Sequence, residues 1–315
     1  MTERKRCPTT IAVLGYGSQG RALALNWRDS GQHLIVGLPT RSPSRRRAKG
    51  DDITRVTTPP RAVAQADIVC FAFPDYLHGK AWSEELEDAV HPGATMVFLH
   101  GLSVHFGYIQ PPDDCDVVLM APHAPGIAVR EKYLSDRSVS AFYAVHQDAS
   151  GAARSTVLKL AADAGFSKKR LIETSFEDEA IGDLFGEQAV LCGGLAMLIK
   201  SGFETLVDKG LPPDNAWLEV AFQLDLIVGL IKHHGIAGMF ERISVAARYG
   251  SLKAGPEIIN DSTRQRMEQV YQRIASGEFA AELAGLSPAD LERLRHDLTN
   301  MTSPELERAA RKFGR

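Results

Sequence analysis

The fold is decided by Thr10-Ile-Ala-Val-Leu-Gly-Tyr-Gly-Ser-Gln-Gly20, a short β-rich apolar run that leads straight into a glycine turn. Residues 21–27 follow with the apolar spacing of a helix. Glycines at these positions allow a tight turn and let a pyrophosphate approach the N-terminus of that helix. The motif is weak alone, but a strand before it and a helix after it make it specific. We therefore predict a dinucleotide site that includes Gly15, Tyr16, Gly17, Ser18, Gln19 and Gly20.

The residues after the second predicted strand, 33–38, bear on which dinucleotide binds. This strand ends without the Asp or Glu that would accept hydrogen bonds from a ribose 2′-hydroxyl. It is followed instead by cations and hydroxyls, which suit a 2′-phosphate. The sequence thus favours NADPH over NADH, and the alternative is a solvated basic loop. The residues concerned are Arg41, Ser42, Ser44 and Arg45.

Three further strands are predicted at residues 67–73, 95–99 and 117–120, and each ends in a turn. In open α/β sheets the ligand lies beyond the carboxyl ends of the strands. We therefore expect Pro74 and Asp75 to contact the cofactor, and we place His100 and His123 where chemistry takes place. The alternative for each histidine is a purely structural role.

Length and charge limit the class of protein. A chain of 315 residues fits two domains. The net charge of −3 gives no electrostatic reason to expect nucleic acid or an anionic membrane as a partner. The cysteines are far apart and form no CxxC pair, which favours reduced thiols in a cytoplasmic protein. We expect no signal peptide or membrane span, because the apolar run after the first residues is short and interrupted by glycine. The cysteines are Cys7, Cys70, Cys115 and Cys192.

The C-terminal half is predicted to be helical, because β-branched strand patterns disappear after Phe176. We predict domains at residues 1–173 and 174–315. Asp183 and Glu187 stand four residues apart in an apolar run, so a helix presents both on one face. Buried carboxylates are costly unless something neutralises them, and a divalent cation is the natural partner. The alternative is a solvated helix face. Glu219 and Gln223 repeat this spacing.

These segments together resemble the ketol-acid reductoisomerase family in its short-chain form, and the resemblance runs through nearly the whole chain. The run from Asp183 to Gly194 is its most specific motif. The matching segments are Gly15–Gly20, Pro74-Asp75, His100-Gly101, His105-Phe-Gly107, Pro111-Pro112, Asp183 through Gly194, Lys200 through Leu206, Gly235 through Met239, Ile243-Ser244 and Tyr249-Gly250.

The resemblance implies an α/β Rossmann domain that binds NADPH, followed by an all-α knotted helical domain. It further implies a homodimer or higher homo-oligomer whose chains share active sites, and two Mg²⁺ ions. The implied reaction converts 2-acetolactate to 2,3-dihydroxyisovalerate by alkyl migration and hydride transfer, in branched-chain amino-acid biosynthesis. By position, Asp183 resembles the carboxylate that bridges the two ions, Glu187 a second acid, and His100 the active-site histidine. Glu219 and Ser244 resemble groups supplied by the partner chain, a metal-linked acid and a hydroxyl that holds the substrate carboxylate.

Two departures from the family pattern fall in the implied site. His123 stands where the family has a lysine that helps order metal-bound waters, and Gln223 stands where the family has a second glutamate. An amide in place of a carboxylate removes a negative charge from the shell of a dication, so we expect the second ion to bind more weakly. Glu257 and Ile127 also differ from the residues common in the family.

These departures favour a divergent member of the family. Migration in a ketol needs both oxygens held by metal, whereas reduction needs one Lewis acid and a proton donor. We therefore hypothesise an NADPH- and Mg²⁺-dependent reductase of a 2-keto acid, in which Asp183, Glu187 and His100 or His123 carry the chemistry. A complete reductoisomerase, acting on a 2-hydroxy-3-keto acid, is the alternative. A catalytically silent dimer that senses NADPH is a third possibility, which the retained acids argue against.

Overall fold

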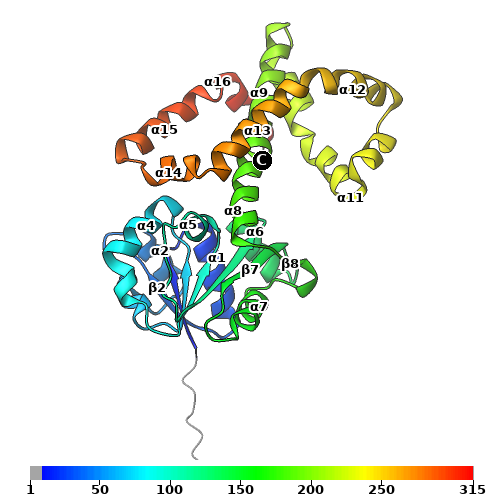
Figure 1. Ribbon diagram of the computed structural model, residues 1–315. Coiled ribbons are helices and arrows are strands. Elements are labelled where there is room, and N and C mark those ends of the chain that lie inside the picture. Colours follow the sequence, from blue (N-terminus) through cyan, green and yellow to red (C-terminus); the bar gives the residue numbers. More distant parts are fainter. Residues whose placement is uncertain (1–8, 315) are drawn as a thin grey trace, which may run out of the picture. The chain divides into compact units, whose positions relative to one another are not determined.

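The computed structural model describes residues 9–314 as two compact units that divide between Gly182 and Asp183 (Figure 1). This division falls inside helix α8 (Phe176–Phe185), whereas the sequence pattern put the boundary before it, at 173/174. Cys7 lies outside the described residues. The other three cysteines, Cys70, Cys115 and Cys192, are free thiols.

Unit 1 contains one eight-stranded sheet in the order β3-β2-β1-β4-β5-β6-β7-β8. The first six strands pair in parallel, β7 is antiparallel to β6, and β8 is parallel to β7. The order 3-2-1-4-5-6 is that of a doubly wound dinucleotide-binding fold, so the predicted Rossmann architecture is confirmed. The strands are β1 (Thr10–Leu14), β2 (His33–Gly37), β3 (Val56–Thr57), β4 (Ile68–Phe71), β5 (Thr95–Phe98), β6 (Asp116–Pro122), β7 (Ala141–Gln147) and β8 (Leu171–Glu173).

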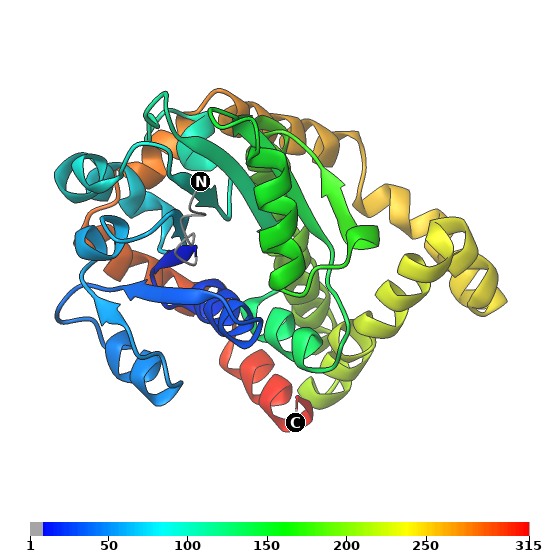
Figure 2. The same ribbon diagram turned by 90° about the horizontal axis from the view of Figure 1, so that it is seen from below.

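Helices cover both faces of this sheet, with α1 and α7 on one side and the helices of residues 59–89 on the other (Figure 2). The central strands are buried along almost their whole length, which explains their unbroken apolar sequences. Trp27 of α1 is fully buried and its indole N–H donates to the carbonyl of Leu160 in α7. The helices are α1 (Ser18–Asp29), α2 (Ser44–Gly50), α3 (Pro59–Val63), α4 (His78–Ala81), α5 (Leu102–His105), α6 (Gly126–Leu134) and α7 (Ala153–Asp163).

Unit 2 is entirely helical, as predicted, and several of its helices begin at a polar cap. In α15, Ser287 and Asp290 form a reciprocal capping box. A knot in this unit stays a prediction. The helices after α8 are α9 (Gly193–Asp208), α10 (Pro213–Trp217), α11 (Leu224–Arg242), α12 (Val245–Ile258), α13 (Asp261–Ala275), α14 (Glu278–Ala284), α15 (Pro288–Asn300) and α16 (Pro304–Phe313).

Unit 2 buries few side chains completely. Its small core joins α9, α10 and α16 through Phe203, Ala216, Leu306 and Ala309. Many large apolar side chains of the unit are exposed, among them Leu226, Leu252 and Ile258. Two helical stretches, Phe176–Asp208 and Pro213–Arg242, are long and apolar enough to cross a membrane by length and composition, which is weak evidence by itself.

Candidate active site

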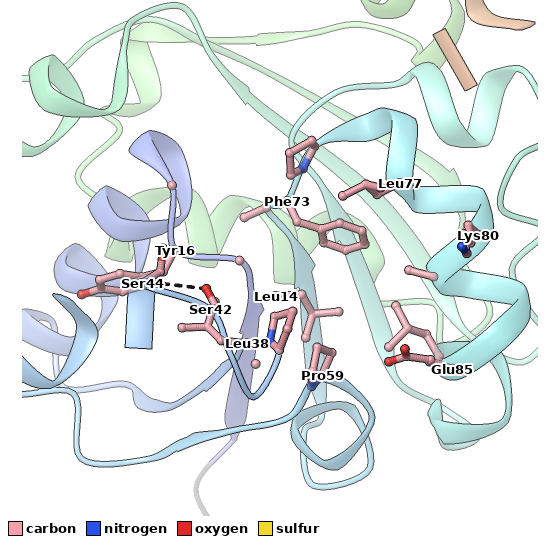
Figure 3. A pocket seen from close by; sticks show the side chains of 18 of the residues that line it. Leu14, Tyr16, Leu38, Ser42, Ser44, Pro59, Phe73, Leu77, Lys80 and Glu85 are labelled. Carbon is pink, nitrogen blue, oxygen red and sulfur yellow. Dashed lines mark hydrogen bonds between the residues drawn. The ribbon is translucent and has the colours of Figure 1, made fainter. Parts of the chain in front are cut away.

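A cavity of about 520 Å³ opens at the carboxyl ends of β1, β2 and β4 (Figure 3). This is where a doubly wound sheet binds its nucleotide. The glycine turn lies on one side, and the loop after β4 with the helical residues 77–86 lies on the other. The residues around it include Gly15, Tyr16, Gly17, Leu38, Ser42, Ser44, Pro59, Phe73, Pro74, Leu77, Lys80, Glu84 and Glu85.

The three glycines of the turn are required for different reasons. Gly15 has a φ of +100°, and a Cβ there would lie 2.5 Å from the carbonyl oxygen of Ala72. A Cβ on Gly20 would lie 2.7 Å from the oxygen of Gly15, so this glycine lets α1 approach the strand. A Cβ on Gly17 would meet nothing within 4 Å. Gly17 lines the cavity, so its missing side chain leaves room for a diphosphate at the start of α1. The turn therefore fits a dinucleotide.

The side chains between these glycines bind protein groups. The buried Tyr16 donates its hydroxyl proton to Asp51 Oδ2 over 3.1 Å, and burial together with the Asp51 charge raises its pKa. Ser18 Oγ accepts from the backbone N–H of Gly126, and Gln19 Nε2 donates to the oxygen of Ala124. These two contacts tie the glycine turn to the loop that carries His123.

Only some of the residues predicted to bind a 2′-phosphate line the cavity. Ser42 and Ser44 line the cavity, and the backbone N–H of Ser44 donates to Ser42 Oγ (Figure 3). Arg41 is exposed and does not line the cavity. Arg45 is half-buried, and its guanidinium donates to the carbonyls of Leu38 and Thr57. Hydroxyls and backbone therefore form this end of the cavity, and the cations lie around it.

The loop after β4 contributes Pro74 but not Asp75 to the cavity wall. The sequence reasoning missed Lys80, Glu84 and Glu85, which also line it. Glu84 and Glu85 belong to a π-helical turn, Trp82–Leu86, that no sequence signal marked.

The half-buried His100, just after β5, lies close to the buried acid Glu179 of α8. The backbone N–H of Gly101 donates to Glu179 Oε2 over 2.5 Å, and His100 Nδ1 lies 3.8 Å from the same oxygen. The N–H of Leu102 donates to His100 Nδ1 over 3.0 Å, so the ring proton of a neutral His100 resides on Nε2. Glu179 is 3% exposed.

Asp183 lies one turn after Glu179 in helix α8. We looked for three or more His, Cys, Asp or Glu side chains close enough to share a metal ion. Within residues 9–314 there is one such group, His100, Glu179 and Asp183, whose ligand atoms lie within 4.8 Å of one another. A set of two carboxylates and one imidazole suits a hard divalent cation. Sequence reasoning missed Glu179, although Glu179, Asp183 and Glu187 repeat at a spacing of four.

The other predicted metal ligands lie at π-helical turns. Glu187 belongs to the turn Gly186–Leu191, whose backbone bond runs from Cys192 N–H to the oxygen of Glu187. Glu219 belongs to the turn Leu218–Phe222, and Gln223 follows it directly. Such turns inside helices are frequent at functional sites. All three side chains are exposed in this single chain, so the prediction that they lie in an apolar core does not hold for one chain alone.

The glycine pair Gly193-Gly194 explains the first of these turns. A Cβ on Gly193 would lie 2.2 Å from the oxygen of Gln188, and a Cβ on Gly194 would lie 2.2 Å from the oxygen of Ala189. Any side chain at these positions would collide with the wide turn. The apolar motif thus combines acids with the two glycines that set their backbone geometry.

The remaining predicted residues lie elsewhere. His123 is exposed and its ring contacts Phe142 edge to face, with centroids 4.2 Å apart. Ser244 caps α12, and its Oγ accepts from the N–H of Ala247. The roles of both in substrate or water binding stay predictions.

A doubly wound sheet with a glycine-lined cavity and an acid–histidine cluster beyond its strand ends defines a dinucleotide-dependent oxidoreductase. The family profile described as "Acetohydroxy acid isomeroreductase, NADPH-binding domain" matches residues 7–169, and "Ketol-acid reductoisomerase, C-terminal domain" matches residues 176–315. The chain therefore belongs to the ketol-acid reductoisomerase family, whose first domain binds NADPH.

Similar proteins support this assignment over most of the chain. The "Ketol-acid reductoisomerase (NADP(+))" of Pyrobaculum arsenaticum is 48% identical over 87% of this chain and 83% of its own length. The protein of the same name from Pyrococcus abyssi is 41% identical over 96% of this chain and 91% of its own. The solved structure of an NADH-preferring ketol-acid reductoisomerase from an uncultured archaeon covers 96% of this chain and 93% of its own, with a TM-score of 0.90 and 35% identity.

Proposed function

We propose that this protein is a complete ketol-acid reductoisomerase that converts 2-acetolactate to 2,3-dihydroxyisovalerate with NADPH. The observation that carries the proposal is the cluster of His100, Glu179 and Asp183, which lies just beyond a strand of the nucleotide-binding sheet. The names of relatives that are 41–48% identical support the same activity. The sequence pattern alone favoured a divergent reductase, and these relatives favour the complete reaction instead.

The residues fit Mg²⁺ as a further requirement. Asp183 and Glu187, with Glu179 beside them, offer carboxylate oxygens, and Glu219 and Gln223 would add oxygens from a second copy. When bound, the ion supplies a Lewis acid for the substrate oxygens. The chain itself excludes water from Glu179 by burial and fixes its carboxylate with the N–H of Gly101.

His100 is the proposed hydrogen-bond donor to the substrate. Its Nδ1 accepts from the N–H of Leu102, so the neutral ring carries its proton on Nε2 and donates from that atom to a substrate oxygen. Ser244 of a second copy would hold the substrate carboxylate through its hydroxyl.

A reductase without isomerase activity is the second candidate, and His123 and Gln223 are the observations that favour it. An imidazole and an amide thus stand where the family has an amine and a carboxylate. Both changes alter the groups around the metal waters without altering the cofactor cavity. They would weaken the migration step more than the hydride step.

The exposed apolar helices of unit 2 support a homodimer. A monomer rarely leaves so many large apolar side chains exposed, and a second copy would cover them. A membrane could also cover them, but the protein we propose is cytoplasmic and binds neither membrane nor nucleic acid. Light scattering of detergent-free protein tests this: a stable dimer supports the proposal, and a requirement for detergent opposes it.

The function is tested by following NADPH oxidation with Mg²⁺ present and two substrates offered separately. One is 2-acetolactate and the other is 3-hydroxy-3-methyl-2-ketobutyrate, the product of migration. Turnover of both supports the complete enzyme. Turnover of the keto acid alone supports the reductase. Inactivity with both, together with NADPH binding, would support a nucleotide sensor.

A further inference from the structure

His78 is a buried histidine that the reaction just described does not use. It begins α4, five residues after Phe73, and it is 2% exposed. The rings of Phe71 and Phe73 pack edge to face against it, with centroids 5.8 Å and 4.4 Å away. The carboxylate of Asp75 lies 3.7 Å from Nδ1. Burial among these rings lowers the pKa of His78, so the ring is neutral at pH 7.

Both ring nitrogens of His78 make hydrogen bonds, and the partners fix the tautomer. Nε2 lies 3.0 Å from the carbonyl oxygen of Phe73, which can only accept. Nε2 therefore carries the proton. Nδ1 must then accept, and it lies 2.7 Å from Ser103 Oγ, which donates. One neutral ring thus connects two backbone segments that are distant in sequence.

The two segments are walls of different parts of the site. Phe73 lines the nucleotide cavity (Figure 3), and so does the next residue, Pro74. Ser103 is fully buried in α5 (Leu102–His105), the short helix that starts directly after His100 and Gly101. Gly101 in turn donates to Glu179. A continuous chain of bonds therefore runs from the cavity wall through His78 to the histidine and acid of the cluster.

We propose that His78 is a positioning residue, which holds the cavity wall at Phe73 in register with the helix that follows His100. Its purpose is to keep the bound nicotinamide and the ring of His100 at the separation that hydride transfer requires. The inference rests on the proposed function, because it assigns a step in which both groups act. An error of about 1 Å between reacting groups is enough to lower a rate ~100-fold.

Three variants test this role. His78→Leu removes both hydrogen bonds, and Ser103→Ala removes one. His78→Gln is the conservative variant, because its amide N–H₂ can donate to Phe73 and its amide oxygen can accept from Ser103. We expect His78→Leu to lower kcat with the migrated keto acid by about 30- to 100-fold while KM for NADPH changes less than about threefold. Ser103→Ala should lose about three- to tenfold, and His78→Gln should retain most of the activity.

A merely structural role predicts a different result. If His78 only stabilises the core, His78→Leu lowers the melting temperature, but the folded enzyme keeps its kcat. If His78→Gln is as slow as His78→Leu, the hydrogen bonds are not what matters. Either outcome would overturn the proposal.

A readout that needs no turnover separates this inference from the proposed function. In protein with ¹⁵N-labelled histidine, NADPH titration should shift the His100 ring resonances of the wild type and of His78→Gln, and the shift should be lost in His78→Leu. Wild-type inactivity with both substrates would contradict the function, whereas this coupling would still stand. An equal shift in all three proteins, or none in the wild type, would contradict the role of His78.

Discussion

The two units of this chain differ in how completely they bury their apolar residues. Unit 1 buries both faces of its sheet, so that strands such as β4 and β5 are inaccessible along their whole length. Unit 2 has a comparable supply of apolar residues but leaves many of them exposed and buries few completely, with one small cluster around Phe203. The hydrophobic core of unit 1 is therefore complete within one chain, and we infer that the core of unit 2 is completed only by a second copy.

The chemistry follows the same division. The nucleotide cavity, with Gly17 and Ser44 in its wall, is complete within unit 1. In unit 2, Glu187, Glu219 and Ser244 are exposed and spread along three separate segments. Changes at the cofactor cavity of unit 1 should hence alter cofactor use, whereas changes at the acids of unit 2 should remove the reaction as a whole.

The largest effect is expected from the glycine pair of unit 2. Replacing Gly193 and Gly194 by alanine puts methyl groups 2.2 Å from two carbonyl oxygens, which forces the π-helical turn to rewind and moves Glu187. We expect kcat to fall at least ~100-fold while NADPH affinity, measured by fluorescence titration, is retained. Gly182→Ala is the control, since its Cβ meets nothing within 4 Å. Equal activity of both proteins would contradict the role given to the pair.

A charge on the exposed apolar face should break the assembly. Leu226 is 65% exposed in the single chain, so glutamate there would be harmless unless a second copy covers it. We expect Leu226→Glu to weaken association by about 3 kcal/mol or more, because it buries an unpaired charge. The sedimentation coefficient and the activity should both decrease. Leu134→Glu in unit 1, where the leucine is also 65% exposed, is the matched control. A Leu226→Glu protein that stays dimeric would show that this face is free.

Cofactor choice should depend on unit 1 alone. Ser44 lines the cavity where a 2′-phosphate is expected, so Ser44→Asp brings two negative charges together. A cost of about 2 kcal/mol lowers kcat/KM with NADPH ~30-fold, and kcat/KM with NADH should hardly change. Ser155→Asp adds the same charge at an exposed position of α7. Parallel losses with both nucleotides would mean that Ser44 does not face the 2′-position.

The smallest effect concerns stability within unit 1. Two hydrogen bonds from Arg21, each 2.7 Å long, hold the pKa of Asp51 below its usual range. A lowered pKa means that the contribution is present above the unfolded pKa of about 3.9 and is lost as pH falls. Asp51→Asn should cost about 1 kcal/mol at pH 7 in urea unfolding, and the difference should shrink at acid pH.

The neighbouring Asp52 supplies the control for this measurement. Asp52 is exposed with a φ of +59°, a conformation that asparagine tolerates. Asp52→Asn should therefore leave the free energy of unfolding unchanged in the same series of measurements. A cost of Asp51→Asn that is constant with pH would show that its charge is not involved.

Sequence patterns predicted unit 1 better than unit 2 for a physical reason. The glycine turn and the buried parallel strands are local features, since their apolar runs and positive-φ glycines are set by neighbours in the chain. Strand β8 was missed because it is three residues long and Ile172 is 51% exposed, so its pairing with β7 defines it.

The site was predictable where spacing is informative and not where backbone geometry decides. Glu179 was overlooked because it precedes the apolar run, although its contact with Gly101 makes it the most buried acid of the cluster. The π-helical turns were not foreseen, because they depend on a bond from residue i to i+5 that no hydrophobic period marks. Glu219 is exposed in the single chain, although its apolar helix suggested a core position, because the sequence pattern does not show which surface a second copy covers.

The most direct test of the shared site mixes two inactive proteins. Asp183→Asn and Glu219→Gln should each remove activity, because each damages every site of a homodimer. Co-expression of both variants should restore about a quarter of the wild-type rate, since half of the dimers are mixed and each of these keeps one undamaged site. A mixture no more active than its parents would contradict the account, because both residues would then serve the same chain.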